Sequence, residues 1–446
     1  MFKNIFYLLL LLLITLLVLL SFKLIKPVEK IKINRVLSSE VNTLSLDGQE
    51  FRDLNKNGQL DIYEDHRNLP RDRANDLLRK MTLEEKVGQM FHPPFILKPD
   101  LLMFLYEIAI RGNSSTESQI IFDHITHFNL YGNPSPAELA KKINSLQKTA
   151  SRSRLGIPIT ISSDPIHEVP KGGGVASFSV DGFSKWPSQL GFAATSNPKI
   201  IREFAEIVRD EYLAVGIRTA LHPMSDLATE PRWARNFGTF GSNAEMSSKM
   251  TIEYMNGFQQ NDISNKSVLT MVKHFPGGGP QENGLDPHLF SGRNQIYPGG
   301  NFEYHLLPFK EAIKNNLKVI MPYYGIPVGQ TDEDVAMAFN SFILKDLLRE
   351  ELNFDGVICS DWGIITGRHW GVDELSIEQR YEKSIKAGID QYGGEKDTDY
   401  LIDLVKNGQI TEVRIDESVR RILLNKFELG LFDNPYVNEE LVQYKV

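Results

Sequence analysis

Polar side chains that could carry out chemistry follow several apolar, strand-like runs of this sequence. The run Val357-Ile358-Cys359 ends at Asp361, which is flanked by Trp362 and Gly363. A carboxylate at the tip of a buried strand is costly unless hydrogen-bond partners or chemistry offset the charge. A single Asp at this position could also cap the helix that follows it. Other runs end at further polar residues, namely Asp164, Lys273 with His274, and Tyr323, and one long loop carries Arg232 and Arg235.

These side chains would be adjacent if the runs were parallel strands of one sheet, because the carboxyl ends of such strands share one face. The resulting pocket would hold carboxylates, cations and aromatic rings together. Charged side chains bind sugar hydroxyls, and aromatic rings pack on the apolar C–H faces of a sugar. We therefore expect a carbohydrate-binding pocket that includes Asp361, rather than a capping Asp.

A second pattern of oxygen-bearing residues lies between Asp53 and Glu64. It matches the twelve-residue D-x-[DN]-x-[DN]-G-x5-E calcium loop, with Gly58 at the sharp turn. We expect a structural Ca²⁺ here rather than a sensor site, because only one such loop occurs. The expected ligands are Asp53, Asn55, Asn57, the Gln59 carbonyl, Asp61 and Glu64.

The elements that must position the pocket alternate between apolar runs and amphipathic helical patterns. Eight strand candidates alternating with helices predict a parallel sheet and a TIM-like (β/α)8 barrel over residues 71–430. An open doubly wound sheet is the alternative, although no G-x-G-x-x-G nucleotide motif follows the first run. The candidates are 87–92, 125–131, 157–164, 216–223, 268–276, 318–325, 356–361 and 388–393.

Composition excludes several other classes of function. The chain has 446 residues and a net charge of −8 without a basic stripe, which argues against a nucleic-acid partner. Its single cysteine, Cys359, cannot form a disulfide within the chain or a cysteine-based metal site. We expect a buried, unreactive thiol.

The N-terminus is strongly apolar. Asn4 to Phe22 carries no charge and approaches the length of about 20 residues that spans a bilayer. We expect residues 1–26 to be a signal-anchor, with a cleaved signal peptide as the alternative, and residues 27–70 to be a tether that carries the calcium loop. Basic residues after the apolar segment favour a cytosolic body, whereas a calcium loop suits an exported one. We expect export, either to the cell membrane or to the periplasm or extracellular space.

Three motifs together resemble glycoside hydrolase family 3, in its β-glucosidase-like branch of exo-glycosidases. They are KHFPGGGP at 273–280, SDWG at 360–363 and RRILLNKFELGLFDNP at 420–435. The resemblance covers about residues 53–436 and implies a TIM-like catalytic barrel with a retaining mechanism. It implies that Asp361 is the nucleophile, and we expect Lys273 and Arg235 to keep this carboxylate ionised. The residues that it implies for the sugar pocket are Asp164, Arg235, Lys273, His274, Tyr323 and Trp362.

The catalytic acid/base is where the sequence departs from this branch. There the acid is a Glu from a second, α/β sandwich domain, and here residues 431–446 match only the linker toward such a domain. One interpretation is a split enzyme whose partner polypeptide supplies the acid, and another is a catalytically silent glycan-binding barrel. The third is a local acid like the Asp-x-His pair of the family's β-N-acetylhexosaminidases, which Asp286 and His288 would provide. Glu282 on the same loop is a weaker candidate.

Overall fold

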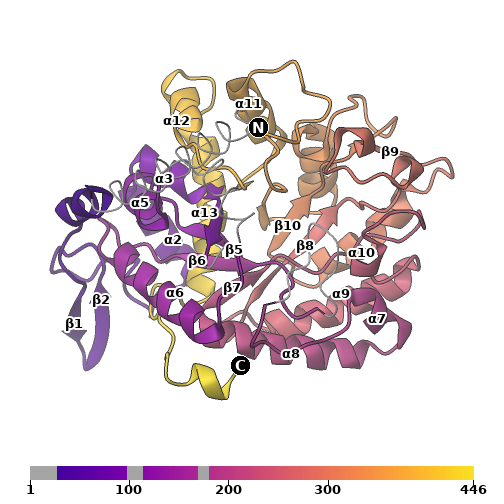
Figure 1. Cartoon of the computed structure of the whole chain (residues 1–446). Coiled ribbons are helices and arrows are strands. Elements are labelled where there is room, and N and C mark those ends of the chain that lie inside the picture. Colours follow the sequence, from indigo (N-terminus) through magenta and orange to yellow (C-terminus); the bar gives the residue numbers. More distant parts are fainter. Residues whose placement is uncertain (1–27, 98–113, 169–179) are drawn as a thin grey trace, which may run out of the picture.

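The computed structural model describes residues 28–97, 114–168 and 180–446, and its centre is a seven-stranded parallel sheet (Figure 1). This confirms the expected α/β fold with a parallel sheet. In spatial order the strands are β12 (Val357–Ile358), β10 (Val319–Pro322), β8 (Leu269–Phe275), β7 (Ile217–Ala220), β6 (Thr160–Ser163), β5 (His127–Tyr131) and β4 (Pro94–Ile96).

A further strand pair connects the two edges of this sheet. β13 (Tyr392–Gly393) pairs in parallel with β3 (Phe91–His92), which directly precedes β4. A parallel bridge between Cys359 and Gln391 links the end of β12 to the start of β13. These contacts lead from β12 back to β4, as a closed barrel requires, and they favour the barrel over an open sheet.

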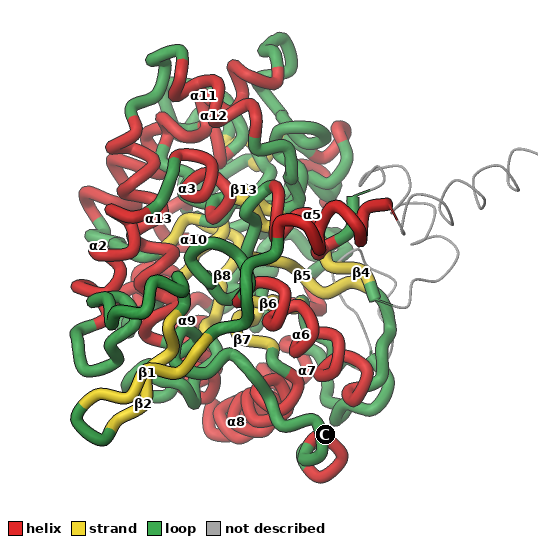
Figure 2. The backbone as a smooth tube through the Cα atoms, turned by 90° about the vertical axis from the view of Figure 1, so that its left-hand side faces the viewer, coloured by secondary structure: helices red, strands yellow, loops and turns green. Residues whose placement is uncertain are grey.

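Helices surround the strands on the outside (Figures 1 and 2). Apart from α2 and α3, which precede β3, these helices follow barrel strands in the chain and bury apolar side chains against them, as a βα repeat demands. The helices are α2 (Pro70–Lys80), α3 (Leu83–Gln89), α5 (Thr116–Phe122), α6 (Pro136–Ser151), α7 (Gln189–Ala194), α8 (Pro198–Val215), α9 (Ala244–Gln259), α10 (Phe302–Lys314), the π-helical segment η5 (Phe342–Glu351), α11 (Ile377–Ala387), α12 (Asp399–Lys406) and α13 (Glu412–Glu428).

Each of the eight strand candidates contains an observed strand, but the first was drawn too long. Residues 87–89 belong to α3, because Thr82 and Glu85 form a capping box that starts this helix. The strand therefore covers only Phe91 and His92. The short strand β4 was not expected.

The segment expected to be a tether has structure of its own. Residues 28–36 are helical, and β1 (Asn42–Leu46) and β2 (Gln49–Asp53) form an antiparallel hairpin that protrudes from the body (Figure 2). The proposed anchor, Asn4 to Phe22, lies outside the described residues. Among the residues that are described, no helix is long and apolar enough to cross a bilayer.

The C-terminal segment packs along the outside of the barrel. The Asn144 side chain on α6 exchanges two hydrogen bonds with the backbone of Val437, of 2.9 and 3.0 Å. Asp433 pairs with Arg73 on α2, whose guanidinium is buried. Residues 431–446 are therefore bound to both α2 and α6.

A buried carboxylate anchors the base of β12. Asp390, which is fully buried, accepts hydrogen bonds from Arg349 (2.5 Å) and from the backbone N–H of Ile358 (3.0 Å). Arg414 and Arg421 lie 3.6 and 3.3 Å from its other oxygen. Burial alone would raise the pKa of Asp390, but the three arginines lower it, so the carboxylate is ionised at neutral pH.

Asp390→Ala is expected to destabilise the fold by about 3–5 kcal/mol, because it leaves three partly buried guanidinium groups without a counter-charge. Asp355→Ala is the matched control, since the exposed Asp355 also contacts Arg421 and should cost less than about 1 kcal/mol. Chemical denaturation of both variants measures the difference, and equal midpoints would contradict the role of Asp390. Because the pKa of Asp390 is lowered on folding, its stabilisation should be lost as the pH falls below about 4.

Candidate active site

The carboxyl ends of the parallel strands bring the predicted polar residues to one region of the barrel. Lys273 and His274 end β8, Tyr323 follows β10, Asp164 follows β6, and Asp361 follows β12. All of these side chains are buried or nearly so. The prediction that these strand ends meet is therefore correct.

Asp361 lies at the tip of a rigid turn. The Ser360 backbone N–H donates to the Gln391 carbonyl, and the Ser360 hydroxyl accepts a hydrogen bond from the Gly393 backbone N–H. These two bonds connect the turn to β13. The Asp361 Oδ1 atom accepts a hydrogen bond of 2.8 Å from the Trp362 backbone. Its Oδ2 atom is buried and has no hydrogen-bond partner within the described parts of the chain. This oxygen therefore keeps its lone pairs free.

Lys273 serves a different carboxylate from the one that we expected. Its ammonium lies 3.0 Å from Asp164 Oδ1, and the second oxygen of Asp164 accepts a hydrogen bond of 3.2 Å from Asn129. We expected Lys273 to keep Asp361 ionised. The structure instead places it on Asp164, so that both oxygens of Asp164 are held in position.

A second buried pair holds His274. Its Nδ1 atom lies 2.7 Å from Asp226 Oδ2, and Arg235 Nη1 lies 3.3 Å from its Nε2. Although burial would raise the pKa of Asp226, His274 and the backbone N–H groups of His274 and Gly278 lower it. Burial lowers the pKa of His274, so the imidazole is neutral and its Nε2 accepts from Arg235. The His274 Nε2 atom lies 3.8 Å from Asp361 Oδ2.

Asp286 and His288 form a third pair next to this group. His288 Nδ1 lies 2.5 Å from Asp286 Oδ1, while Trp233 Nε1 donates to Asp286 Oδ2 at 2.9 Å. The Tyr323 hydroxyl accepts from Arg235 at 3.0 Å and reaches the same Asp286 oxygen at 3.4 Å. Burial would raise the pKa of Asp286, but the hydrogen bond from His288 and the charge of Arg235 lower it. Arg235 and Tyr323 therefore connect Asp286 to His274.

The Trp362 backbone carbonyl accepts from the Tyr324 hydroxyl and from Arg368, at 2.9 and 3.0 Å. A side chain at Gly393 would collide with the Trp362 ring, so the glycine allows the indole to lie on β13.

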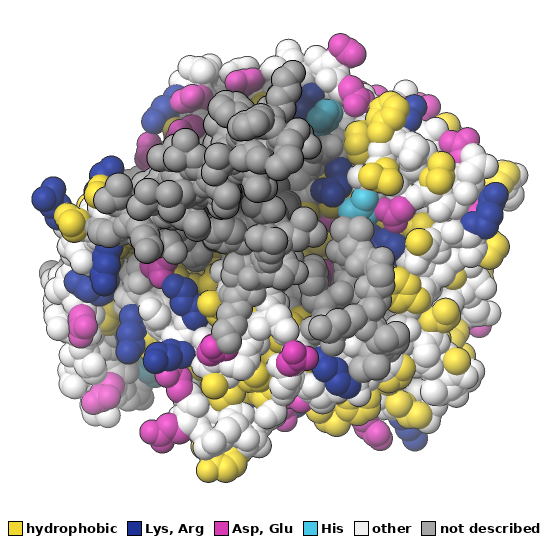
Figure 3. All heavy atoms as spheres, viewed as in Figure 1, with side chains coloured by type: hydrophobic (Ala, Val, Ile, Leu, Met, Phe, Trp, Pro, Cys, Tyr) yellow, Lys and Arg dark blue, Asp and Glu magenta, His cyan; other side chains and the backbone are white. Residues whose placement is uncertain are grey.

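On the face seen in Figure 1, histidine, acidic and basic side chains lie beside hydrophobic ones (Figure 3). Leu289 and Phe290, which follow His288 in the chain, are both exposed.

Two weaker candidates have other partners. Arg232 is exposed and forms an ion pair with Glu230, and Glu282 accepts a hydrogen bond from Asn294. Sequence reasoning missed Asp226, Asn129 and Trp233. Asp226 could have been found, because it follows the 216–223 run as Asp164 follows its own.

The calcium loop has its sharp turn, since Gly58 has a φ of +74°. Its oxygens, however, contact hydrogen-bond donors of the protein. Asp53 accepts from the backbone of Asn57 and Gly58, and the ammonium of Lys80 lies 2.7 Å from Asp61 Oδ1. In the parts of the chain that can be described, no three His, Cys, Asp or Glu residues are grouped to hold a metal. The residue types and their order suit Ca²⁺, but the side chains are not gathered around one point.

Comparison with known proteins gives one family. The model of the "Glycosyl hydrolase family 3 N terminal domain" matches residues 82–424. Beta-glucosidase C of Emericella nidulans is 48% identical over 398 residues, which is 86% of this chain and 63% of that protein. The periplasmic beta-glucosidase/beta-xylosidase of Dickeya chrysanthemi is 40% identical over 425 residues, covering 89% of this chain and 64% of that protein.

A solved structure has the same fold. The family 3 β-N-acetylglucosaminidase of a Paenibacillus species aligns with a TM-score of 0.64 and 25% identity, over 79% of this chain and 63% of that one. This chain thus spans less than two thirds of the length of the curated relatives that it matches.

Proposed function

This chain belongs to glycosyl hydrolase family 3, and on that premise we propose that it is a retaining exo-β-glycosidase of the β-glucosidase type. It would remove terminal, non-reducing β-linked sugars from oligosaccharides or glycosides. The relatives named beta-glucosidase and beta-glucosidase/beta-xylosidase support this substrate class. The periplasmic names of the Dickeya and Salmonella relatives support export.

The observation that carries the proposal is the free Oδ2 atom of Asp361. The carboxylates of Asp164, Asp226 and Asp286 each have hydrogen-bond partners at both oxygens. A buried oxygen without a partner is costly, and such strain is typical of a catalytic group. Asp361 is therefore the carboxylate that is best prepared to form a bond with substrate.

The chemistry follows in two displacements. Asp361 Oδ2 attacks the anomeric carbon while the bond from that carbon to the leaving oxygen breaks, and the leaving oxygen takes a proton from an acid. Water then attacks the same carbon and gives its proton to the conjugate base, and the ester bond to Asp361 breaks. Asp164, Lys273, Arg235 and His274 would bind the sugar hydroxyls, with Tyr323 and Trp362 lining the pocket.

We propose His288 as the local acid/base, because its position favours it over Glu282. Its Nδ1–H points to Asp286, so the Nε2 atom is left to exchange a proton with the leaving group. Asp286, held by Trp233 and Tyr323, would stabilise the imidazolium form. An acid from a separate α/β sandwich polypeptide, or a glycan-binding barrel without turnover, would be revealed by the experiments below.

A Ca²⁺ ion at residues 53–64 stays a proposal based on the order of its oxygen donors. Asp53, Asn55, Asn57, Asp61 and Glu64, with the Gln59 carbonyl, would hold it, and Lys80 would have to leave Asp61. The ion would link β2 to α2. A membrane anchor at Asn4 to Phe22 likewise stays a proposal.

A 2-deoxy-2-fluoro-β-glucoside with a dinitrophenyl leaving group is expected to label Asp361, because fluorine slows the second displacement more than an activated first one. Peptide mass spectrometry of the digested protein should find one sugar on the peptide that contains Asp361. The Asp361→Asn variant should stay unlabelled. A wild-type chain that binds glucose without being labelled would instead be a glycan-binding barrel.

His288→Ala is expected to lower kcat on an alkyl β-glucoside by about 10²–10⁴-fold, since the poor leaving group needs a proton. The loss should be small on a dinitrophenyl glucoside, which needs little acid assistance. His369→Ala, a partly exposed histidine outside this pair, serves as the control. Equal activity of His288→Ala and wild type on the alkyl glucoside would point to an acid on another polypeptide.

Chelation is expected to lower the melting temperature if Ca²⁺ binds at 53–64, because the ion would stabilise only the folded state. Differential scanning calorimetry with excess chelator, and then with Ca²⁺ restored, measures the change. Asp53→Asn with Glu64→Gln should abolish the response. A wild-type melting temperature that changes neither with excess chelator nor with added Ca²⁺ would rule out the calcium proposal.

A further inference from the structure

Below the sugar-binding residues, a line of buried polar side chains runs through the barrel interior. Asn129 on β5 donates to Asp164 at 3.2 Å, and Ser162 on β6 donates to Asn129 Oδ1 at 2.9 Å. His92 on β3 lies next, with its Nε2 atom 2.8 Å from the Ser162 hydroxyl. All four side chains are buried.

The direction of every hydrogen bond in this line is fixed from its upper end. The Asp164 carboxylate accepts from the Lys273 ammonium at one oxygen and can only accept at the other, so Asn129 must point its amide N–H toward it. The Asn129 oxygen then faces Ser162, whose hydroxyl donates to it at 2.9 Å and, over a longer distance of 3.4 Å, to the Phe128 carbonyl. Having used its proton, Ser162 must accept from His92 Nε2–H.

These directions leave His92 Nδ1 without a proton. Burial lowers the pKa of His92 to about 3, so the ring is neutral and carries one N–H, on Nε2. Nδ1 is therefore an acceptor, and among the described residues it has no hydrogen-bond partner. Leaving such an acceptor unpaired in the core would cost free energy.

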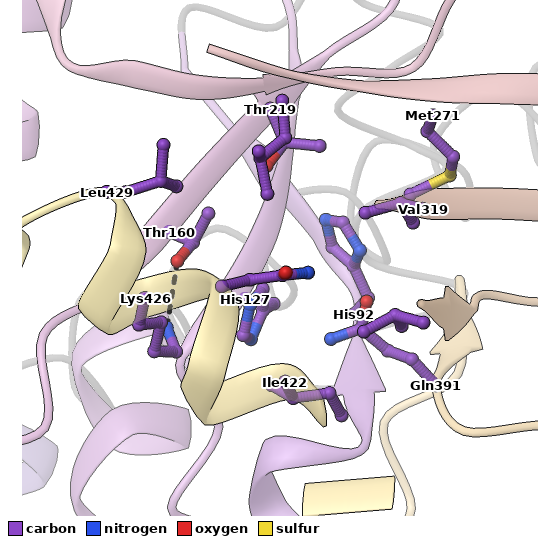
Figure 4. Close-up of a pocket in the computed structure, with 13 residues that line it drawn as sticks. His92, His127, Thr160, Thr219, Met271, Val319, Gln391, Ile422, Lys426 and Leu429 are labelled. Atoms are coloured by element: carbon purple, nitrogen blue, oxygen red, sulfur yellow. Dashed lines mark hydrogen bonds between the residues drawn. The ribbon is translucent and has the colours of Figure 1, made fainter. Parts of the chain in front are cut away.

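His92 lines a small cavity inside the barrel, between the amino-terminal ends of the strands and α13. The rings of His92 and His127 point into this cavity, and Lys426 on α13 points to Thr160 beside it (Figure 4). Its volume of about 20 Å³ exceeds the 10–15 Å³ that one water needs. His127 Nδ1 is a second ring nitrogen without a hydrogen-bond partner in the described structure, so a water here has two ring nitrogens to bond.

We propose that His92 positions Asp164 through Ser162 and Asn129, and that one buried water in the cavity donates to His92 Nδ1. Lys273 holds one oxygen of Asp164, and this line of donors holds the other. The carboxylate is then fixed in rotation, so its remaining lone pairs are directed at the hydroxyl of the bound sugar. His92 contacts no substrate and acts only through its neighbours. This role depends on the proposed glycosidase function.

Ser162→Ala tests the line, because it deletes only the hydroxyl that joins His92 to Asn129. It should lower kcat/KM on an intact β-glucoside by about ten- to hundred-fold, as expected when a binding group is misplaced. A series of monodeoxy glucosides identifies the sugar hydroxyl that Asp164 binds. It is the hydroxyl whose removal makes wild type and Asp164→Ala equal in kcat/KM. On that deoxy glucoside, Ser162→Ala should also equal wild type in kcat/KM, because residues that act on the same contact are not additive.

Ser247→Ala is the matched control. Ser247 on α9 is equally buried, and its hydroxyl has no hydrogen-bond partner in the described residues, so the substitution removes the same atom without breaking the line. It should change kcat/KM less than twofold. His92→Gln, which keeps an N–H near the Nε2 position, should retain activity within about threefold. His92→Leu should lose as much as Ser162→Ala.

An equal loss on every glucoside, or equal losses for His92→Gln and His92→Leu, would overturn the positioning role. A high-resolution crystal structure without density in the cavity would overturn the water. If wild type turns over no glycoside, the proposed glycosidase function is wrong, but the line of hydrogen bonds is not yet contradicted. The ¹⁵N shifts of His92 then decide the line, because protonated Nε2 supports it and protonated Nδ1 contradicts it.

Discussion

The cost of burying ionised side chains is the constraint on which the mouth of this barrel depends. Each charged group there has a partner from another element, as Asp164 has Lys273 on β8 and Asp226 has His274. Because such pairs tolerate little movement, the strand tips must stay in register to within a hydrogen-bond length. Asp361 is the exception, with one oxygen unpaired in the described structure. Its neighbours are already committed to one another, so that oxygen is available to substrate.

At the base of the barrel the cost of burying polar groups is offset by partners within the protein, and no atom is left for substrate. Asp390 satisfies arginines from η5 and α13, and it also accepts the backbone N–H of Ile358, three residues before Asp361. The Lys426 ammonium likewise donates to three oxygens, Thr126 O, Pro158 O and Thr160 Oγ1. Both buried groups therefore have hydrogen-bond partners. The base thus fixes β12, and β12 presents the nucleophile candidate at its other end.

Sequence reasoning predicted which polar side chains lie together, because parallel strands put their carboxyl ends on one face, whatever their exact register. It could not assign partners, because these depend on the register between strands. Lys273 was expected beside Asp361 but lies beside Asp164, and the pairing of β8 with β10 skips His274. The calcium loop shows the same limit. The order of oxygens in the chain does not reveal that Lys80, nineteen residues after Asp61, reaches its carboxylate.

The interior of the barrel shows how residues at its mouth can depend on buried ones. Barrels of this kind usually fill their centre with branched apolar side chains, yet here His92, Ser162 and Asn129 occupy part of it. Buried polar groups are tolerated only when their hydrogen bonds agree in direction, and here one carboxylate sets that direction for all of them. Any substitution in the line that reverses one donor must therefore disturb Asp164, although no loop at the mouth has changed. In contrast, the Asp286–His288 pair is held by Trp233 and Tyr323, so its position does not depend on this line of hydrogen bonds.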